Sequence, residues 1–218
     1  APARALADGV VYIDMEQLTE STINTALAGL TGARGLIIDL RGTLTVDETP
    51  LLRRLATQPR AQIARVVQRA LTEPCFASIR EAATACPDIR ESRGWFRAID
   101  TSTVFSGRIV ALIDERTSDA MERLALTLDQ MSRITLIGSA SAGSISPVTP
   151  LSLPGGLTVG IATQEWRRGD GAQIQRVGLT PFIDVRPTAR GLRSLDDEVL
   201  TRALQWMQQQ LEPARRRR

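Results

Sequence analysis

Residues 117–122 hold a threonine, a serine, an aspartate and a glutamate, the closest grouping of side chains that could do chemistry. A second polar run, SASAGSIS, occupies residues 139–146. A serine hydroxyl attacks a carbonyl carbon only when a neighbouring base takes its proton. The chain has no histidine, and all 27 of its cationic side chains are arginines, which stay protonated at any working pH. Serine chemistry would therefore need a base other than the usual nitrogen bases.

Asp119 has two interpretations. As the N-cap of a helix, with Glu122 three residues later, it would form a capping box, and the helix dipole would favour its charge. As a site residue, it would serve as an acid, a base or an anchor for a ligand. Ser118 is an alternative nucleophile, but a shift of one residue at a helix start turns a side chain by about 100°. The serines of SASAGSIS also fit a flexible loop.

The elements that would position these residues alternate between strands and helices. Apolar runs predict buried strands at 9–15, 35–40, 108–114 and 134–138. Helical spacing predicts helices at about 19–31, 50–70, 119–131 and 195–207. This order contains two βαβ units and therefore predicts a parallel sheet. Residues 71–103 fit neither pattern, and we expect an irregular insertion there.

The last part of the chain changes character. Residues 150–166 alternate around Pro154-Gly155-Gly156, which predicts a β-hairpin. The segment VGLTPFIDV follows as a short last strand, before the closing helix. We expect residues 1–210 to form one domain and the arginine-rich residues 211–218 to be a disordered tail.

Composition limits the partners. The pI is 9.6, but without Arg215–Arg218 the formal charge changes from +3 to −1, so we expect no nucleic-acid partner. A nucleic-acid contact through this tail is the alternative. No apolar stretch is long enough to span a membrane. Cys75 and Cys86 would form a disulfide if the protein is exported, and we favour an exported or periplasmic location. Two cysteines without histidine argue against a zinc site, and we expect neither a metal nor a cofactor.

Three segments, in this order, resemble the tail-specific (C-terminal-processing) serine peptidase family. They are ARGLIIDLRG at 33–42, SGRIVALIDERTSDAMERLALTL at 106–128, and the stretch from IGSASAG to DDEVLTRAL at 137–204. The third, with VGLTPFIDVRPTARGL, is most similar to the bacterial branch related to interphotoreceptor retinoid-binding protein. The resemblance implies an α/β fold with a ClpP/crotonase-like core, a mostly parallel sheet flanked by helices, a C-terminal β-hairpin and a closing helix.

The resemblance also implies site positions, and this chain departs from them. The family has a serine nucleophile two residues after a threonine and three residues before a glutamate. Here Thr117 and Glu122 match, but Asp119 occupies the nucleophile position. In one branch a lysine base follows a Thr-x-Gly turn, and here Ser144 stands in its place. The other branch uses a histidine base, which this chain lacks.

The family's glycine-rich turn, which supplies an oxyanion-hole amide, is also altered. After Gly42 the chain continues with Thr43-Leu44-Thr45-Val46. Gly42, Thr43 and Ala120, which follows the nucleophile position, are the candidates for what remains of the oxyanion hole.

Two functional hypotheses follow. The first is a degenerate, proteolytically inactive peptidase-like domain that binds a peptide or a small apolar ligand, or acts as a scaffold. The alternative is an active serine peptidase in which Ser118 or another serine attacks, with a base supplied by a partner or by a segment outside the chain. Carboxylate chemistry through Asp119 and Glu122 is a further enzymatic possibility. A homo-oligomer is compatible with both hypotheses.

Overall fold

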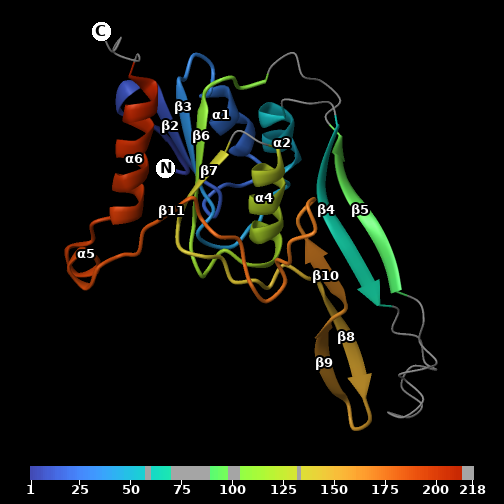
Figure 1. Cartoon of the computed structure of the whole chain (residues 1–218). Helices are drawn as coiled ribbons and strands as arrows, with labels where there is room; N and C mark the ends of the chain where they lie inside the picture. Colours follow the sequence, from blue (N-terminus) through green and yellow to red (C-terminus); the bar gives the residue numbers. More distant parts are fainter. Residues whose placement is uncertain (57–59, 70–88, 98–103, 132–133, 213–218) are drawn as a thin grey trace.

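The computed structural model describes residues 1–56, 60–69, 89–97, 104–131 and 134–212. Its centre is a six-stranded sheet in the order β1-β2-β3-β6-β7-β11 (Figure 1). These strands are β1 (Ala3–Ala5), β2 (Val10–Asp14), β3 (Gly35–Asp39), β6 (Arg108–Ile113), β7 (Ile134–Gly138) and β11 (Ile183–Asp184). All neighbouring pairs are parallel except β1 and β2. The predicted parallel sheet is thus confirmed.

Helices cover both faces of the sheet, which explains why its strands are apolar at consecutive positions. The face that carries Leu36 and Ile38 packs against α1 (Ile23–Ala28), α2 (Thr49–Leu55) and α4 (Asp119–Gln130). The face that carries Ile37 packs against α6 (Glu198–Leu211). Figure 1 shows α6 on the opposite side of the sheet from α1, α2 and α4, with the short α5 (Ala189–Ser194) below it. A short helical turn, η1 (Ala7–Gly9), precedes β2. The predicted flanking helices and closing helix are confirmed.

The closing helix begins three residues later than its predicted start at residue 195. Leu195 takes a left-handed conformation, with φ of 57°, at the end of α5. Asp197 then caps α6, since its carboxylate accepts the amide of Leu200 at 2.9 Å. The cap rather than the apolar pattern sets the helix start. The first helix is likewise shorter than predicted, because residues 19–22 form a hydrogen-bonded turn.

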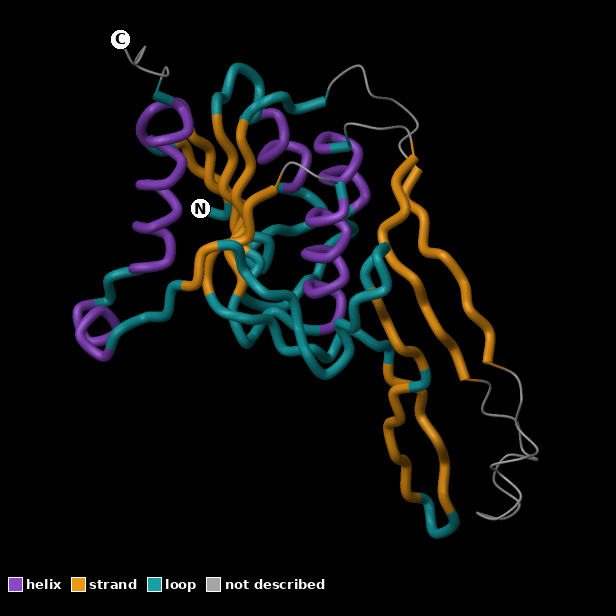
Figure 2. Tube along the Cα trace, in the orientation of Figure 1, coloured by secondary structure: helices purple, strands orange, loops and turns teal. Residues whose placement is uncertain are grey.

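The antiparallel part lies to one side of the central sheet. A three-stranded sheet in the order β10-β4-β5 contains β4 (Arg60–Arg69), β5 (Ile89–Arg97) and β10 (Gln164–Arg167). The predicted hairpin is confirmed as β8 (Val148–Leu153) and β9 (Leu157–Ala162), which extend away from the body (Figure 2).

Two predictions for the middle of the chain were wrong. The helix expected over residues 50–70 ends at Leu55, and residues 60–69 form β4. Ala64 and Val66 are buried two residues apart, the spacing of a strand face, because β4 pairs with β5 and β10. Within the expected irregular insertion at 71–103, residues 89–97 form β5.

Some predictions fall outside the described residues. Cys75, Cys86 and Arg215–Arg218 are among these, so the disulfide and the tail stay predictions. Within the described ranges no helix combines the length and the apolar character needed to cross a membrane. The same ranges contain no group of three or more acidic, histidine or cysteine side chains able to hold a metal ion.

Candidate active site

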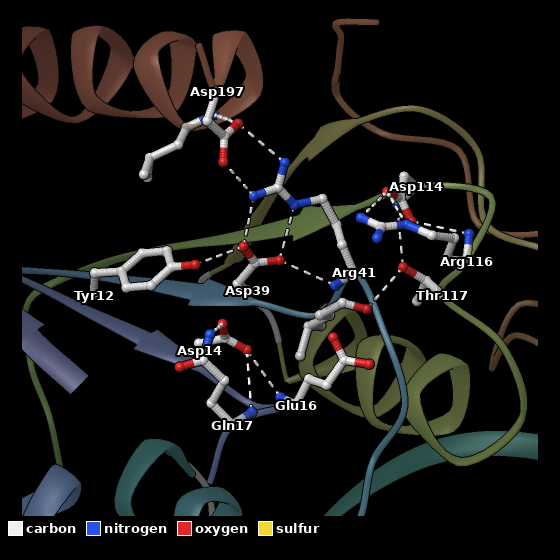
Figure 3. Close-up of polar contacts among 12 residues, drawn as sticks. Tyr12, Asp14, Glu16, Gln17, Asp39, Arg41, Asp114, Arg116, Thr117 and Asp197 are labelled. Atoms are coloured by element: carbon white, nitrogen blue, oxygen red, sulfur yellow. Dashed lines mark hydrogen bonds and ion pairs between the residues drawn. The ribbon is translucent and has the colours of Figure 1, made fainter. Parts of the chain in front are cut away.

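The turn between β6 and α4 holds the predicted nucleophile position. Thr117 is fully buried, and its hydroxyl donates to the carbonyl of Leu40 at 2.9 Å. The same hydroxyl accepts the amide of Asp114 at 3.1 Å. The bond to Leu40 fastens the turn to the end of the neighbouring strand β3, and the bond from Asp114 closes the turn itself, as Figure 3 shows. Thr117 therefore fixes where the next two residues emerge.

Asp119 emerges from this turn as an exposed side chain. It is the first residue of α4 and has a φ of 48°, a left-handed conformation that costs a non-glycine residue roughly 1–3 kcal/mol. Ser118, half-buried and extended, takes the N-cap position and makes no side-chain cap. The capping-box prediction for Asp119 was therefore wrong, because the cap position lies one residue earlier. Ala120 is the second residue of α4, where helix amides lack an intrahelical acceptor.

Glu122 points away from the helix start and into the protein. It is fully buried, and its Oε1 accepts the Ser141 hydroxyl and, at 2.8 Å, the Gly143 amide. Its Oε2 is buried without a hydrogen-bond partner in the described part of the chain. Burial raises the pKa of Glu122 above the ordinary glutamate value, although the Ser141 hydroxyl and the Gly143 and Ser144 amides oppose this. The carboxylate of Asp119 raises it further.

The serine-rich loop is held by Glu122 on one side and by residue 179 on the other. Ser141 accepts the Leu179 amide at 2.7 Å through its hydroxyl, and its own amide donates to the Leu179 carbonyl at 3.1 Å. Ser141 is thus a buried structural hydroxyl, and the loop is fixed at this point. The half-buried Ser144, at the predicted base position, follows directly after Gly143, beside Glu122.

The predicted oxyanion turn is close to a carboxylate that the sequence analysis missed. Gly42 is buried, and a Cβ there would lie 2.5 Å from the carboxyl carbon of Glu16. Glu16 also accepts the amide of Thr43, at 3.3 Å. The amide of Thr43 is thus engaged by an anion of the protein itself.

A sequence signal for Glu16 exists. Strands β2 and β3 end in isoleucine-aspartate, and Asp114 directly follows Ile113, the last residue of β6. The residue two positions after the aspartate is Glu16, Arg41 or Arg116, respectively. After β3 and after β6, the arginine pairs with the aspartate two residues before it. The glutamate in β2 has the opposite charge, and Asp14 instead accepts the amides of Glu16 and Gln17. Burial and the nearby Asp39 raise the pKa of Asp14.

Arg41 links the end of β3 to the start of α6 (Figure 3). Its guanidinium binds Asp39 at 2.9 and 2.6 Å and Asp197 at 3.0 and 2.6 Å. Burial lowers the pKa of Arg41, but the bonds to both carboxylates keep it above the ordinary value. Tyr12 donates to Asp39 at 2.7 Å, and burial followed by the Asp39 charge raises the pKa of its phenol. This network joins the end of β3 to the start of α6.

A cavity of about 510 Å³ lies beside the serine-rich loop. Its walls combine both charges with apolar side chains: Glu115, Ser139, Ala140, Arg186, Pro187 and Leu192. Ser139 donates to Glu115 at 3.0 Å. A backbone amide bond, and after it this bond from Ser139, lower the pKa of the Glu115 carboxyl. The volume is in the range of small-ligand pockets.

Comparison with known proteins gives the family context. The model of peptidase family S41 matches residues 9–185. No curated protein sequence matches the chain. Mature CPAF in complex with lactacystin is similar with a TM-score of 0.71 and 14% identity, over 96% of this chain and 54% of that one.

Two further solved structures share the fold. The photosystem II D1 C-terminal processing protease has a TM-score of 0.55 and 19% identity, over 91% of this chain and 53% of its own. The tricorn protease has a TM-score of 0.61 and 16% identity, over 94% of this chain and 18% of its own. The chain therefore spans about half the length of the first two relatives and a smaller share of the third.

Proposed function

Because the chain belongs to peptidase family S41, we propose that it is a proteolytically inactive member that binds a peptide or a small apolar ligand. The observation that carries the proposal is Asp119, which stands exposed on the turn into α4 where the resemblance puts the serine nucleophile. A carboxylate there cannot form the acyl-enzyme of a serine peptidase through a hydroxyl.

The other parts of the site support the same proposal. Ser144 stands at the base position, and neither histidine nor lysine occurs anywhere in the chain. The Thr43 amide is engaged by Glu16, so this donor is not free for a substrate oxyanion. The cavity beside Ser139 offers a ligand both apolar contacts and charges of both signs.

The competing hypothesis is an active serine peptidase in which Ser118 attacks. Ser118 is half-buried, one residue before the exposed position, and no basic side chain is hydrogen-bonded to it in the described ranges. Ser141 is bonded to a carboxylate but is only 7% exposed, so it faces the loop packing rather than a substrate. Among the residues that the structure describes, no contact favours the competing hypothesis.

A fluorophosphonate probe tests the proposal, because it reacts with activated serines. We expect intact-mass measurement to show no adduct on the purified protein, with a known serine peptidase as positive control. A stoichiometric adduct on Ser118 or any other serine would overturn the proposal.

Ligand binding is tested with a fluorescein-labelled digest of casein, followed by fluorescence anisotropy. We expect the large cation of Asp119→Arg to weaken binding, and Glu212→Gln at the end of α6 to leave it unchanged. If Asp119→Arg and Glu212→Gln bound the labelled digest equally well, the ligand would not bind at the site around Asp119.

A further inference from the structure

Another cavity lies at the opposite end of the central sheet from the candidate active site. It has a volume of about 750 Å³ and is formed where β3, β6 and β7 begin and where α6 ends. This volume is in the range of small-ligand sites. The lining side chains that can donate a hydrogen bond are Arg34, Ser106, Arg108, Thr135, Trp206 and Gln210.

The two arginines of this cavity are brought together by the pairing of β3 with β6. Gly35 lies opposite Arg108 in that register, and the Arg108 amide donates to the Arg34 carbonyl at 3.1 Å. Gly107 permits this close approach, because a Cβ there would lie 2.5 Å from the Arg34 carbonyl oxygen. The backbone therefore places two arginines side by side at this end of the sheet.

The cavity does not neutralise the positive charge of these two arginines. None of the described residues that line it is acidic. Arg34 donates through Nη2 to the Leu211 carbonyl at 2.7 Å, which holds the side chain in place without cancelling its charge. The exposed side chain of Arg108 makes neither a hydrogen bond nor an ion pair within the described ranges. Arg41, by contrast, is bonded to two aspartates.

The helix α6 adds an aromatic ring to the same cavity. Trp206 is half-buried, and Gln210 lies four residues later, which places both residues on one side of the helix. A guanidinium group binds the oxygens of a carboxylate or phosphate through paired hydrogen bonds. An indole ring stacks against another flat ring. The cavity therefore combines binding groups for an anion with a binding surface for a ring.

We propose that this cavity binds a small organic anion that carries a flat aromatic ring, with its carboxylate or phosphate on Arg34 and Arg108 and its ring against Trp206. An uncharged ligand would leave both guanidinium groups without an anionic partner, and an inorganic anion would leave the ring of Trp206 uncovered. The inference goes beyond the proposed function, because the cavity is built from the beginnings of the strands and not from their ends.

Isothermal titration calorimetry with two probes tests the proposal. AMP carries its ring on a phosphate, and indole-3-acetate carries its ring on a carboxylate. Adenosine and indole-3-acetamide are the counterparts without the charge, and inorganic phosphate and acetate are the counterparts without the ring. We expect at least one probe to bind at one site per chain, more than about tenfold more tightly than both of its counterparts. The probe that binds more tightly identifies the anionic group.

Neighbouring residues of α6 provide a matched pair of variants. Gln210 lines the cavity, and the exposed Gln209 does not, so a glutamate at either position changes the net charge equally. We expect Gln210→Glu to raise the dissociation constant of the bound probe by more than about tenfold, and Gln209→Glu to leave it within about threefold. Arg108→Met, which removes the unpaired cation, should weaken binding as Gln210→Glu does. Circular dichroism melting confirms that the variants are folded.

Three results would overturn the proposal. The first is the absence of saturable binding of either probe at concentrations up to about 1 mM. The second is a counterpart that binds as tightly as its probe, which would show an adventitious ion only or a site for uncharged rings. The third is equal weakening by Gln210→Glu and Gln209→Glu, which would place the anion on the general surface of the molecule rather than in this cavity.

Discussion

At the scale of single residues, Glu122 is the side chain whose environment differs most from what its sequence position indicates. Its spacing from Asp119 predicts a surface cap, but the side chain is fully buried and holds Ser141 and Gly143. Ionising a buried carboxyl that has one unpartnered oxygen costs free energy, because the charge is removed from water. The raised pKa of Glu122 expresses this cost.

This cost predicts a pH dependence for Glu122→Gln. A carboxyl with a raised folded pKa contributes stability below its ordinary pKa, about 4.3, and loses it as the pH rises through the folded value. Glutamine keeps the acceptor oxygen and has no charge. We therefore expect the free energy of unfolding of the variant to improve relative to the unaltered protein as the pH rises from 4 to about 7. Urea titrations at several pH values measure this difference.

Two companions make the test specific. Glu122→Ala removes the acceptor, so the buried Gly143 amide loses its partner at a cost of roughly 1–3 kcal/mol. The exposed Glu212→Gln is the control variant, measured under the same conditions. A constant difference between Glu122→Gln and the unaltered protein across the pH range would contradict the raised pKa.

At the scale of elements, the ends of the parallel strands decide how the site is assembled. Thr117 ties the β6–α4 turn to the end of β3, and Arg41 ties the end of β3 to the start of α6. The same isoleucine-aspartate-x-arginine sequence stands at the end of β3 (residues 38–41) and at the end of β6 (residues 113–116) and runs on past each strand. Their arginines nevertheless differ, since the Arg41 side chain is 12% exposed and that of Arg116 is 64% exposed.

The two arginines form a matched pair of variants. Arg41→Met leaves Asp39 buried without its cation, and we expect the free energy of unfolding to fall by about 3–5 kcal/mol. Arg116→Met breaks an exposed ion pair with Asp114, and we expect a loss of less than about 1 kcal/mol. Urea denaturation at neutral pH compares them. If the free energy of unfolding fell by a similar amount in both variants, the burial of Arg41 would not determine how much it contributes to stability.

At the scale of the whole molecule, the fold brings together three segments that are far apart in the chain. The end of β3, the start of α4 and the loop after β7 meet, although residues 42, 119 and 144 are distant in sequence. The three segments that the resemblance assigns to a serine-peptidase-like site thus lie together, and we propose that the departures from that site are confined to individual side chains. This distinction can be tested by replacing those side chains.

We expect Asp119→Ser alone to stay unreactive towards a fluorophosphonate, because the chain supplies no lysine or histidine base. Adding Ser144→Lys puts an amine beside Glu122, whose Oε2 has no partner in the described part of the chain. The double variant should acquire a single adduct at residue 119, measured by intact mass and peptide mapping. Ser144→Lys alone is the control. An equal adduct on Asp119→Ser alone would reveal another base, and no adduct on the double variant would show that the framework itself has changed.

The sequence by itself determined the parallel sheet, its flanking helices and the hairpin, because consecutive apolar residues and the Pro154-Gly155-Gly156 turn are local signals. The proposed departures at Asp119, Ser144 and the turn after Gly42 also come from the sequence, since they depend only on residue identity and order. The sequence failed for residues 60–69, because a strand that pairs with β5 and β10 is stabilised by distant partners and not by its own periodicity.

Only the tertiary structure decided what the polar side chains do. It turned Glu122 inward to the loop at 141–143, placed Glu16 against the Thr43 amide and buried Arg41 between two aspartates. It also left one face of the β8–β9 hairpin uncovered in the single chain. These outcomes depend on which groups meet across the fold, and burial then fixes their charges and hydrogen bonds. Local sequence patterns do not indicate which of these distant groups come into contact.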